Sequence, residues 1–348
     1  MPGSVTALKN EILKVRPEKS SAIYDMAVYL ANKPYNIAQM VIEQLTEPGQ
    51  IVLEPFLGSG VTLVEALRVG RKAVGVDINP YSIIISRASL RDYDVDEYKK
   101  LVDQVVAKTE QKINSLYLTV CDDCGRREGV ITRAEFSDQK LDFVRYYCRF
   151  DQRIPHRKRG KEPKTTLRQP PKRSDSEATK SYEKVDYKVS AQAQKIADTK
   201  LVQNGRLNIK SGERIRDLFS GRNLLATSLL YDAIWKLPDS PKNELMKFTF
   251  LSGIHLMKYT DYKSNSQATY YRPKVRLLER NVLEVFLDRV ELILKGREEY
   301  DAELKGKCKE VKTVQELKSS KGTFLLKLGS SKNLTDIFPT TDLMSIWC

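Results

Sequence analysis

Along the first part of the chain, apolar positions follow two different periods. Short continuous apolar runs at Ile51–Leu53 and Lys72–Asp77 predict buried strands. Apolar residues that recur three and four positions apart predict amphipathic helices. These helices are predicted over Ala22–Ala31, Asn36–Leu45, Val61–Val69 and Tyr81–Leu90. Because strands alternate with helices here, the pattern predicts a parallel α/β sheet.

The rest of the chain changes character several times. A charged helix is predicted over 95–115, short β-like pieces surround cysteines between Tyr117 and Asp151, and Arg153–Arg173 is rich in Lys, Arg and Pro and is predicted to be solvated. Further helices are predicted at Arg214–Leu237, Asn243–Met257 and Val282–Lys295, and a last strand at Thr323–Leu328. We therefore divide the chain into an α/β part (1–95), a connecting helix (96–116), a cysteine insert (117–152), a basic segment (153–200), a helical region (201–320) and a return to the sheet (321–348).

The charge of the chain points to an anionic partner. Lys and Arg number 59 against 45 Asp and Glu, a formal net charge of +14 over 348 residues. Such an excess favours a polyanion such as DNA, because each neutralised phosphate releases condensed counterions. A merely basic soluble protein remains the alternative. No apolar run approaches a membrane span, no secretory h-region opens the chain, and the five cysteines do not form a disulfide framework, so we expect a cytoplasmic protein without membrane contact.

A glycine-containing loop follows the first predicted strand. The strand ends on Glu54, and the chain turns through Gly58 and Gly60 before a helix begins. Glycines there let backbone N–H groups approach a ligand, and the helix N-terminus favours negative charge. The dinucleotide fingerprint needs a third glycine where this chain has Leu63. The loop alone does not distinguish such a site from NAD binding or from an ordinary strand–turn–helix without a ligand.

The motifs around this loop resemble those of DNA amino-methyltransferases. Glu54-Pro-Phe-Leu-Gly-Ser-Gly-Val-Thr62 resembles the Asp-Pro-Phe-x-Gly-x-Gly-Thr loop of the adenine-N6 and cytosine-N4 enzymes, with Glu54 in place of the usual Asp. Gly70–Asn79 resembles the next family motif, and Asn32-Lys33-Pro34 resembles the Lys-Pro element that precedes the loop. A small-molecule or RNA methyltransferase is the less favoured alternative.

The resemblance implies a Rossmann-like sheet that binds S-adenosylmethionine. Glu54 would face the methionyl amino group, Phe56 would line the pocket, and Gly58 and Gly60 would form its floor. Asp77 would accept hydrogen bonds from the ribose hydroxyls. Three further residues of these motifs are assigned to the cofactor site: Lys33, Pro34 and Asn79.

The cysteine insert has the spacing of a zinc knuckle. Cys121 and Cys124 precede Gly125, which allows the tight turn that directs two thiolates at one ion. Cys148 supplies a third thiolate, and Asp151 or His156 is the candidate fourth ligand. Both bound zinc and a ribbon that folds without metal remain open. The insert also resembles a subgroup of bacterial and archaeal DNA methylases, in which a zinc-ribbon-like and helical insert separates the cofactor motif from the catalytic one.

Two segments have compositions suited to nucleic acid. Arg153–Arg173 would contact phosphates as a flexible arm, with a plain solvated linker as the alternative. Lys258–Lys274 interleaves tyrosines with basic and amide side chains, a composition suited to base stacking and backbone contacts. The alternative is a polar loop with half-buried tyrosines. His255 lies on an apolar helix and is predicted to be packed rather than catalytic.

The catalytic motif of the family is missing from the sequence. Amino-methyltransferases hold the flipped base against an Asp/Asn/Ser-Pro-Pro-aromatic tetrapeptide, and no catalytic residue of that kind occurs here. Gln169-Pro-Pro-Lys172 has the wrong ends. Leu328–Pro339 resembles the segment before the motif, and only Thr340–Cys348 follow. We therefore expect an incomplete sheet without the adjoining catalytic strand. The chain would be a truncated, frameshifted or split enzyme that needs a complementary chain, or a non-catalytic DNA- or cofactor-binding remnant.

Overall fold

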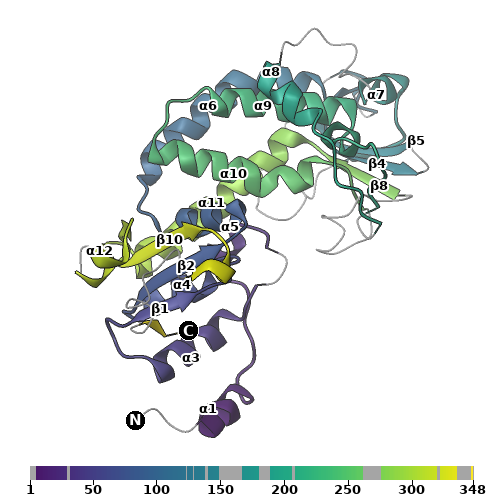
Figure 1. Cartoon of the computed structure of the whole chain (residues 1–348). Coiled ribbons are helices and arrows are strands. Elements are labelled where there is room, and N and C mark those ends of the chain that lie inside the picture. Colours follow the sequence, from purple (N-terminus) through teal and green to yellow (C-terminus); the bar gives the residue numbers. More distant parts are fainter. Residues whose placement is uncertain are drawn as a thin grey trace. The chain divides into compact units, whose positions relative to one another are not determined.

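The computed structural model describes residues 5–29, 32–122, 124–127, 129–137, 140–148, 167–179, 189–205, 208–261, 276–319, 322–334 and 346–347. The chain forms two compact units (Figure 1). Unit 1 comprises Met1–Val95 and Leu292–Cys348, and unit 2 comprises Asp96–Glu291. Unit 1 is thus built from two segments that lie far apart in the sequence.

Unit 1 contains a five-stranded parallel sheet in the order β11-β1-β2-β10-β9 (Figure 1). Its strands are β1 (Ile51–Glu54), β2 (Lys72–Asp77), β9 (Glu310–Val311), β10 (Phe324–Leu328) and β11 (Ile346–Trp347). A parallel sheet is buried on both faces, which explains the continuous apolar runs. One hydrophobic cluster of this sheet is formed by Ile51, Leu53, Val74, Val76, Val311, Val314, Leu317 and Leu325.

The strand β11 lies beside β1 and was not predicted from the sequence. Ile346 and Trp347 pair with Ile51 and Val52 in parallel register. Two residues are too short a run to be recognised by periodicity, and their pairing is fixed by a partner almost 300 positions away. The strand predicted at Thr323–Leu328 is confirmed as β10.

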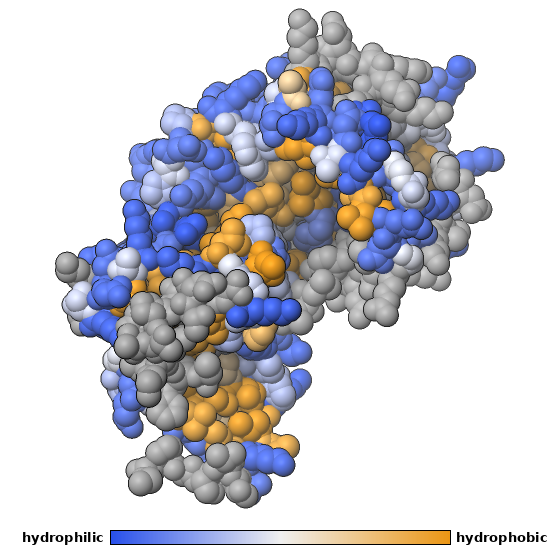
Figure 2. Space-filling view, viewed as in Figure 1, coloured by the Kyte–Doolittle hydropathy of each residue, from blue (hydrophilic) through white to orange (hydrophobic). Residues whose placement is uncertain are grey.

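The helices of unit 1 are α1 (Val5–Ile12), α2 (Ala22–Asp25), α3 (Tyr35–Leu45), α4 (Val61–Arg68), α5 (Pro80–Leu90), α12 (Val314–Lys318), the short 3₁₀ turn η4 (Ser331–Asn333) and the C-terminal part of α11 (Val282–Glu303). Figure 2 shows apolar side chains gathered over α3, where Ile37, Met40 and Val41 are half-buried and Leu45 is exposed. The predictions for α3, α4 and α5 are confirmed within one residue at each end.

Two helix predictions in unit 1 are wrong in length. The helix predicted over Ala22–Ala31 ends at Asp25, and Met26, which follows it, is fully buried in close contact with Gly296 of α11. The helix predicted over Val282–Lys295 continues to Glu303 instead. Its last turns are charged rather than apolar, but Glu299 and Glu303 pair with Arg68 at 2.9 Å and 2.7 Å. Tertiary contacts thus override the local pattern in both places.

Unit 2 contains an antiparallel sheet and a group of helices. The strands run in the order β6-β5-β4-β8-β7, and β3 pairs with β4 outside this path. They are β3 (Leu118–Thr119), β4 (Gly129–Ser137), β5 (Lys140–Cys148), β6 (Leu167–Gln169), β7 (Thr260–Asp261) and β8 (Arg276–Arg280). The helices are α6 (Val95–Ser115), α7 (Arg173–Ala178), α8 (Ala191–Ala197), the 3₁₀ helix η2 (Ile215–Leu218), α9 (Gly221–Trp235) and α10 (Pro241–Met257).

A buried polar network fastens α9 to the sheet of unit 2. Arg222 is fully buried, and its Nε donates to both carboxylate oxygens of Glu279 on β8, at 3.0 Å and 3.1 Å. The Asn223 side chain donates to the carbonyls of Met257 and Arg280, at 2.8 Å and 2.9 Å. The region predicted as one helix over Arg214–Leu237 is therefore split, because Ser220 caps α9 by accepting a bond from the Asn223 amide.

The prediction that all of Arg153–Arg173 is solvated is wrong for its last residues; positions 153–166 lie outside the described residues. Leu167–Gln169 form β6, which pairs with β5. Gln169 is buried, and its amide donates to the Val120 carbonyl at 2.9 Å. Within the part of the chain that the structure describes, no helix is both long enough and apolar enough to span a membrane.

Candidate functional site

The residues of the predicted cofactor site lie at the carboxyl ends of β1 and β2. These strands are adjacent and parallel, and they end on Glu54 and Asp77. Open α/β sheets bind their ligands at this edge, where the loops after the strands open outward. The local sequence produces the arrangement because each buried apolar strand stops at an acidic residue.

Glu54 is buried and fully engaged in the structure. Its Oε2 accepts bonds from the Lys33 ammonium, which forms an ion pair with it, and from the Thr62 hydroxyl at 2.6 Å. Its Oε1 accepts the Phe56 amide at 3.1 Å. A carboxylate held in this way has a defined orientation, and it already receives a cationic amino group. Pro34, directly after Lys33, is the N-cap residue of α3.

The loop between β1 and α4 depends on its two glycines. Gly58 has φ 56° and Gly60 has φ 83°, conformations that side chains disfavour. A Cβ on Gly58 would lie 3.3 Å from the Tyr29 ring, and one on Gly60 would lie 2.4 Å from the Ser86 hydroxyl. Gly60 is the N-cap residue of α4. The loop therefore lies close to its neighbours on both sides.

Asp77 joins this loop to the second strand. Its Oδ2 accepts the Gly58 amide at 2.8 Å, and its Oδ1 accepts the Asn79 amide at 2.8 Å. Asn79 in turn caps α5 by accepting the Tyr81 amide at 3.0 Å. Each carboxylate oxygen has a second lone pair, so Asp77 can still accept bonds from hydroxyl groups of a ligand.

Large apolar side chains are exposed at the same edge. Phe56 is 71% exposed and Ile78 is 75% exposed, although apolar residues of this size usually pack inside. Leu328, which pairs with Asp77 at the end of β10, is also exposed. Together they offer apolar contact beside the two carboxylates. Such a combination suits a ligand with both a planar apolar part and polar groups.

The structure thus brings together Lys33 with Glu54, and Gly58 and Asn79 with Asp77. Thr62, Tyr29 and Ile78 were not predicted as site residues. Thr62 belongs to the recognised loop motif and Ile78 lies between two predicted residues, so both had a local signal. Tyr29 had none, since only the folded chain places its ring against Gly58.

The three cysteines of the insert also come together. The sulfurs of Cys121, Cys124 and Cys148 lie within 4.8 Å of one another, and none of these residues forms a disulfide. The Cys124 and Cys148 sulfurs are 3.6 Å apart. Two thiolates of a tetrahedral zinc site lie about 3.8 Å apart when each Zn–S bond is about 2.3 Å. Gly125, with φ 70°, donates its amide to the Cys121 carbonyl, which closes the knuckle turn. Asp151 and His156 lie outside the described residues.

Of the tyrosine-rich segment 258–274, only the first residues are described. Tyr259 packs edge-to-face on Phe136 with ring centroids 5.5 Å apart, as expected for a half-buried tyrosine. Tyr262, Tyr270 and Tyr271 lie outside the described residues. His255 is packed on α10, as predicted, and burial together with nearby Arg289, Lys258 and Arg280 lowers its pKa to about 4.

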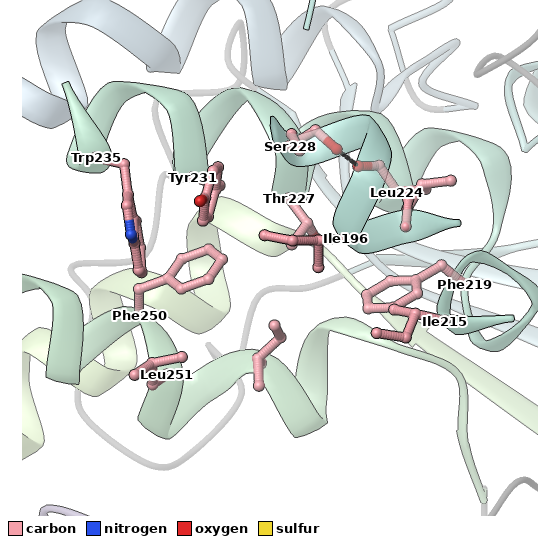
Figure 3. A pocket seen from close by; sticks show the side chains of 13 residues that line it. Ile196, Ile215, Phe219, Leu224, Thr227, Ser228, Tyr231, Trp235, Phe250 and Leu251 are labelled. Carbon is pink, nitrogen blue, oxygen red and sulfur yellow. Dashed lines mark hydrogen bonds between the residues drawn. The ribbon is translucent and has the colours of Figure 1, made fainter. Parts of the chain in front are cut away.

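Unit 2 also contains an apolar cavity of about 250 Å³ between α8, η2, α9 and α10 (Figure 3). Trp235 and Phe250 stand at one end, Phe219 and Ile215 at the other. Tyr231 stacks on Trp235 with ring centroids 4.3 Å apart. Among the described residues that line it, none carries a carboxylate, an imidazole or a basic group.

Comparison with known proteins places the matched segment over this cofactor edge. Residues 9–87 match the family model described as DNA methylase. The segment contains Lys33, Glu54, Gly58, Gly60 and Asp77. The match supports a DNA methylase for this part of the chain.

Several curated proteins are similar to short stretches of the chain. The type II methyltransferase M.MjaII of Methanocaldococcus jannaschii is 29% identical over 97 residues, which cover 28% of this chain and 16% of that protein. M.BsoBI of Geobacillus stearothermophilus is 29% identical over 116 residues, 31% of this chain and 23% of its own length. M.HindIII of Haemophilus influenzae is 36% identical over 83 residues, which cover 23% of this chain and 26% of that protein. The chain thus matches at most about a quarter of these relatives. No solved structure matches it.

Proposed function

We propose that this chain binds S-adenosylmethionine and DNA as part of a DNA amino-methyltransferase, acting on adenine N6 or cytosine N4 in a cytoplasmic restriction–modification system. One observation carries the proposal. Glu54 and Asp77 end two adjacent parallel strands and are linked through the Gly58 loop, within the segment that matches a DNA methylase. The similarity of this segment to type II methyltransferases supports DNA as the substrate class.

The residues present suit the cofactor chemically. Glu54 accepts an ammonium from Lys33, and the methionyl amino group would offer the same chemistry to that carboxylate. Asp77 would accept hydrogen bonds from the ribose hydroxyls while it holds the Gly58 amide. Phe56 and Ile78 would contact the apolar faces of the nucleoside. Bound S-adenosylmethionine supplies an electrophilic methyl group on its sulfonium.

Lys33 and the loop residues would position this ligand. The Lys33 side chain is half exposed, so it can move aside when another amino group binds Glu54. Pro34 fixes the start of α3 beside it, and Asn79 fixes the start of α5 after Asp77. Gly58 and Gly60 give the loop the positive φ angles that its turn needs, so its backbone amides would form the floor of the pocket. These roles are those of binding and orientation rather than of proton transfer.

Methyl transfer would need a further segment. The 348 residues contain no Asp/Asn/Ser-Pro-Pro-aromatic tetrapeptide, and Gln169–Lys172 connects β6 to α7 in unit 2. We propose that a complementary segment or chain supplies this motif. The same absence favours a second candidate function, a non-catalytic subunit that binds DNA and the cofactor.

We further propose that Cys121, Cys124 and Cys148 bind zinc in the insert. The separation of their sulfurs supports a tetrahedral site, with a fourth ligand from elsewhere in the chain or from water. The site would fasten β3 to the end of β5, since Cys121 follows β3 and Cys148 ends β5. Its role would be structural.

The cofactor proposal is tested by calorimetry with S-adenosylmethionine. Asp77→Ala should weaken binding about 10- to 150-fold, because charge-assisted hydrogen bonds worth roughly 1.5–3 kcal/mol are lost. Asp77→Asn keeps one acceptor for the Gly58 amide and should lie between parent and Asp77→Ala.

Asp301→Ala is the matched control, because it removes an exposed carboxylate of the same unit that pairs with Lys305. It should bind like the parent. Equal affinity of the parent and Asp77→Ala would remove Asp77 from the site.

A further inference from the structure

Four arginines form one continuous row across the sheet of unit 2. Arg168 on β6 pairs with Arg145 on β5, Arg145 pairs with Arg133 on β4, and Arg133 pairs with Arg280 on β8. The strands β4, β5 and β8 lie side by side (Figure 1). Directly opposed residues of antiparallel strands project from the same face, so the four side chains share one face. At about 4.8 Å per strand, the row is roughly 14 Å long.

The same face carries more positive charge beyond the row. Ser137 of β4 pairs with Lys140 and with Arg276, and both of these basic side chains are exposed. Among the described cross-strand pairs on this face, the one acid is Glu135, two positions from Arg133. It lies 3.5 Å from Arg145 and 3.3 Å from Arg168. The described cross-strand pairs of this face thus contain six basic side chains and one carboxylate.

The opposite face of the sheet is the buried one. Ala134, Val144 and Glu279 lie there, and Glu279 holds the fully buried Arg222 of α9. On the arginine face Glu135 and Leu278 are also buried, but the Arg168 side chain is 47% exposed and that of Arg145 is 31% exposed. Arg168 also stacks over the Phe143 ring at 3.7 Å, which holds its guanidinium in place.

Opposed like charges destabilise an antiparallel sheet. A row of four arginines therefore lowers the stability of the sheet, and a bound anion would offset that cost. Guanidinium groups bind phosphate oxygens through two parallel N–H donors. A regular row of them suits a regular row of phosphates better than a single small anion.

We infer that this face, formed by Arg133, Arg145, Arg168 and Arg280 with Lys140 and Arg276, binds the phosphate backbone of duplex DNA. The choice of duplex DNA rests on the proposed function. The row is longer than the roughly 12 Å width of the major groove, so it lies across the backbone rather than inside the groove. The contacts hold and orient the duplex without reading its sequence.

The inference is tested by fluorescence anisotropy with a labelled duplex of arbitrary sequence at several salt concentrations. Arg133→Gln/Arg145→Gln/Arg168→Gln should bind at least tenfold more weakly at low salt. The plot of log affinity against log salt concentration should become less steep by roughly 2 to 3, because each lost phosphate contact lowers the slope by about 0.9. Lys99→Gln/Lys100→Gln, which removes two exposed charges from α6 of the same unit, should change the slope little.

Glu135→Gln gives a test in the opposite direction, because removal of the acid on this face should strengthen binding severalfold. A misfolded variant would not bind more tightly. Equal losses in the arginine and lysine variants, an unchanged slope, or a loss seen only with single-stranded DNA would overturn the inference. Calorimetry with S-adenosylmethionine on the same variants should give the parent affinity, so failure of this inference is separable from failure of the cofactor site.

Discussion

At the scale of single residues, Gly60 meets two independent constraints. Its φ of 83° is a conformation that an alanine adopts only at a cost, and a Cβ would lie 2.4 Å from the Ser86 hydroxyl. Gly49 shares the first constraint, with φ 85°, but has no heavy atom within 4 Å of the Cβ position. A comparison of Gly60 with Gly49 therefore separates the cost of backbone strain from the cost of the steric contact.

Gly60→Ala should destabilise the protein by about 2–4 kcal/mol, and Gly49→Ala by about 1–2 kcal/mol. The difference is the contact with Ser86. Urea unfolding followed by circular dichroism measures both. Ser86→Ala should recover part of the loss in the Gly60→Ala protein. Its own effect should be small, because among the described residues its hydroxyl has no hydrogen-bond partner. Equal losses of unfolding free energy in the two glycine variants would show that the Ser86 side chain moves aside without a cost in stability.

The ends of the two strands could be predicted from the sequence, but the contacts around them could not. Glu54 and Asp77 follow short apolar runs, so their positions are local properties of the chain. The bonds from Lys33 to Glu54 and from Gly58 to Asp77 join residues about 20 positions apart. No periodicity encodes such pairs, since they depend on how the loops pack.

At the scale of elements, the turn between β3 and β4 and the end of β5 form the cysteine knuckle. Purified protein should contain up to one zinc ion per chain by elemental analysis, and Cys124→Ser should lose it. Cys308→Ser is the matched control, because Cys308 is a buried thiol outside the cluster, and this variant should keep the metal. Protein that was never exposed to a chelator and contains no zinc would contradict the proposal, and the ribbon would then fold without metal.

Elements with a strong apolar period were predicted well, and so was the charged helix α6, which has the predicted bounds. Very short strands and the charged end of α11 were not predicted. The helices α3, α4 and α5 follow a clear period. The end of α11 consists of charged residues and is held by Arg68, Glu299 and Glu303. The arginine row was also hidden from the sequence, because its members come from four strands whose register the fold alone defines.

At the scale of the whole molecule, the two units carry the two proposed binding sites. Unit 1 contains the carboxyl ends of β1 and β2, and its sheet is completed by β10 and β11, which follow more than 240 residues later. Unit 2 lies between these segments in the sequence and carries the cysteine cluster and the arginine face. Both proposals concern binding rather than methyl transfer itself.

Methyl transfer is therefore the property of the whole molecule that most sharply tests the proposed function. A flipped base needs an acceptor that orients its exocyclic amine toward the methyl group and an aromatic ring that stacks on it, and correct orientation accounts for much of the rate. Residues 1–348 contain no Asp/Asn/Ser-Pro-Pro-aromatic motif. In the proposed function, a cofactor bound at Glu54 and Asp77 would bring the methyl group but would not place an amine in line with it.

We expect residues 1–348 alone to transfer no tritiated methyl group to unmethylated genomic DNA. A segment that carries the motif, fused or co-expressed, should restore transfer, because it would supply the acceptor and the aromatic ring that orient the target amine. The matched control is the same segment with the first residue and the aromatic residue of the motif changed to alanine, which should leave transfer absent. Robust turnover by residues 1–348 would contradict the prediction, since the chain would then orient the amine with groups other than this motif.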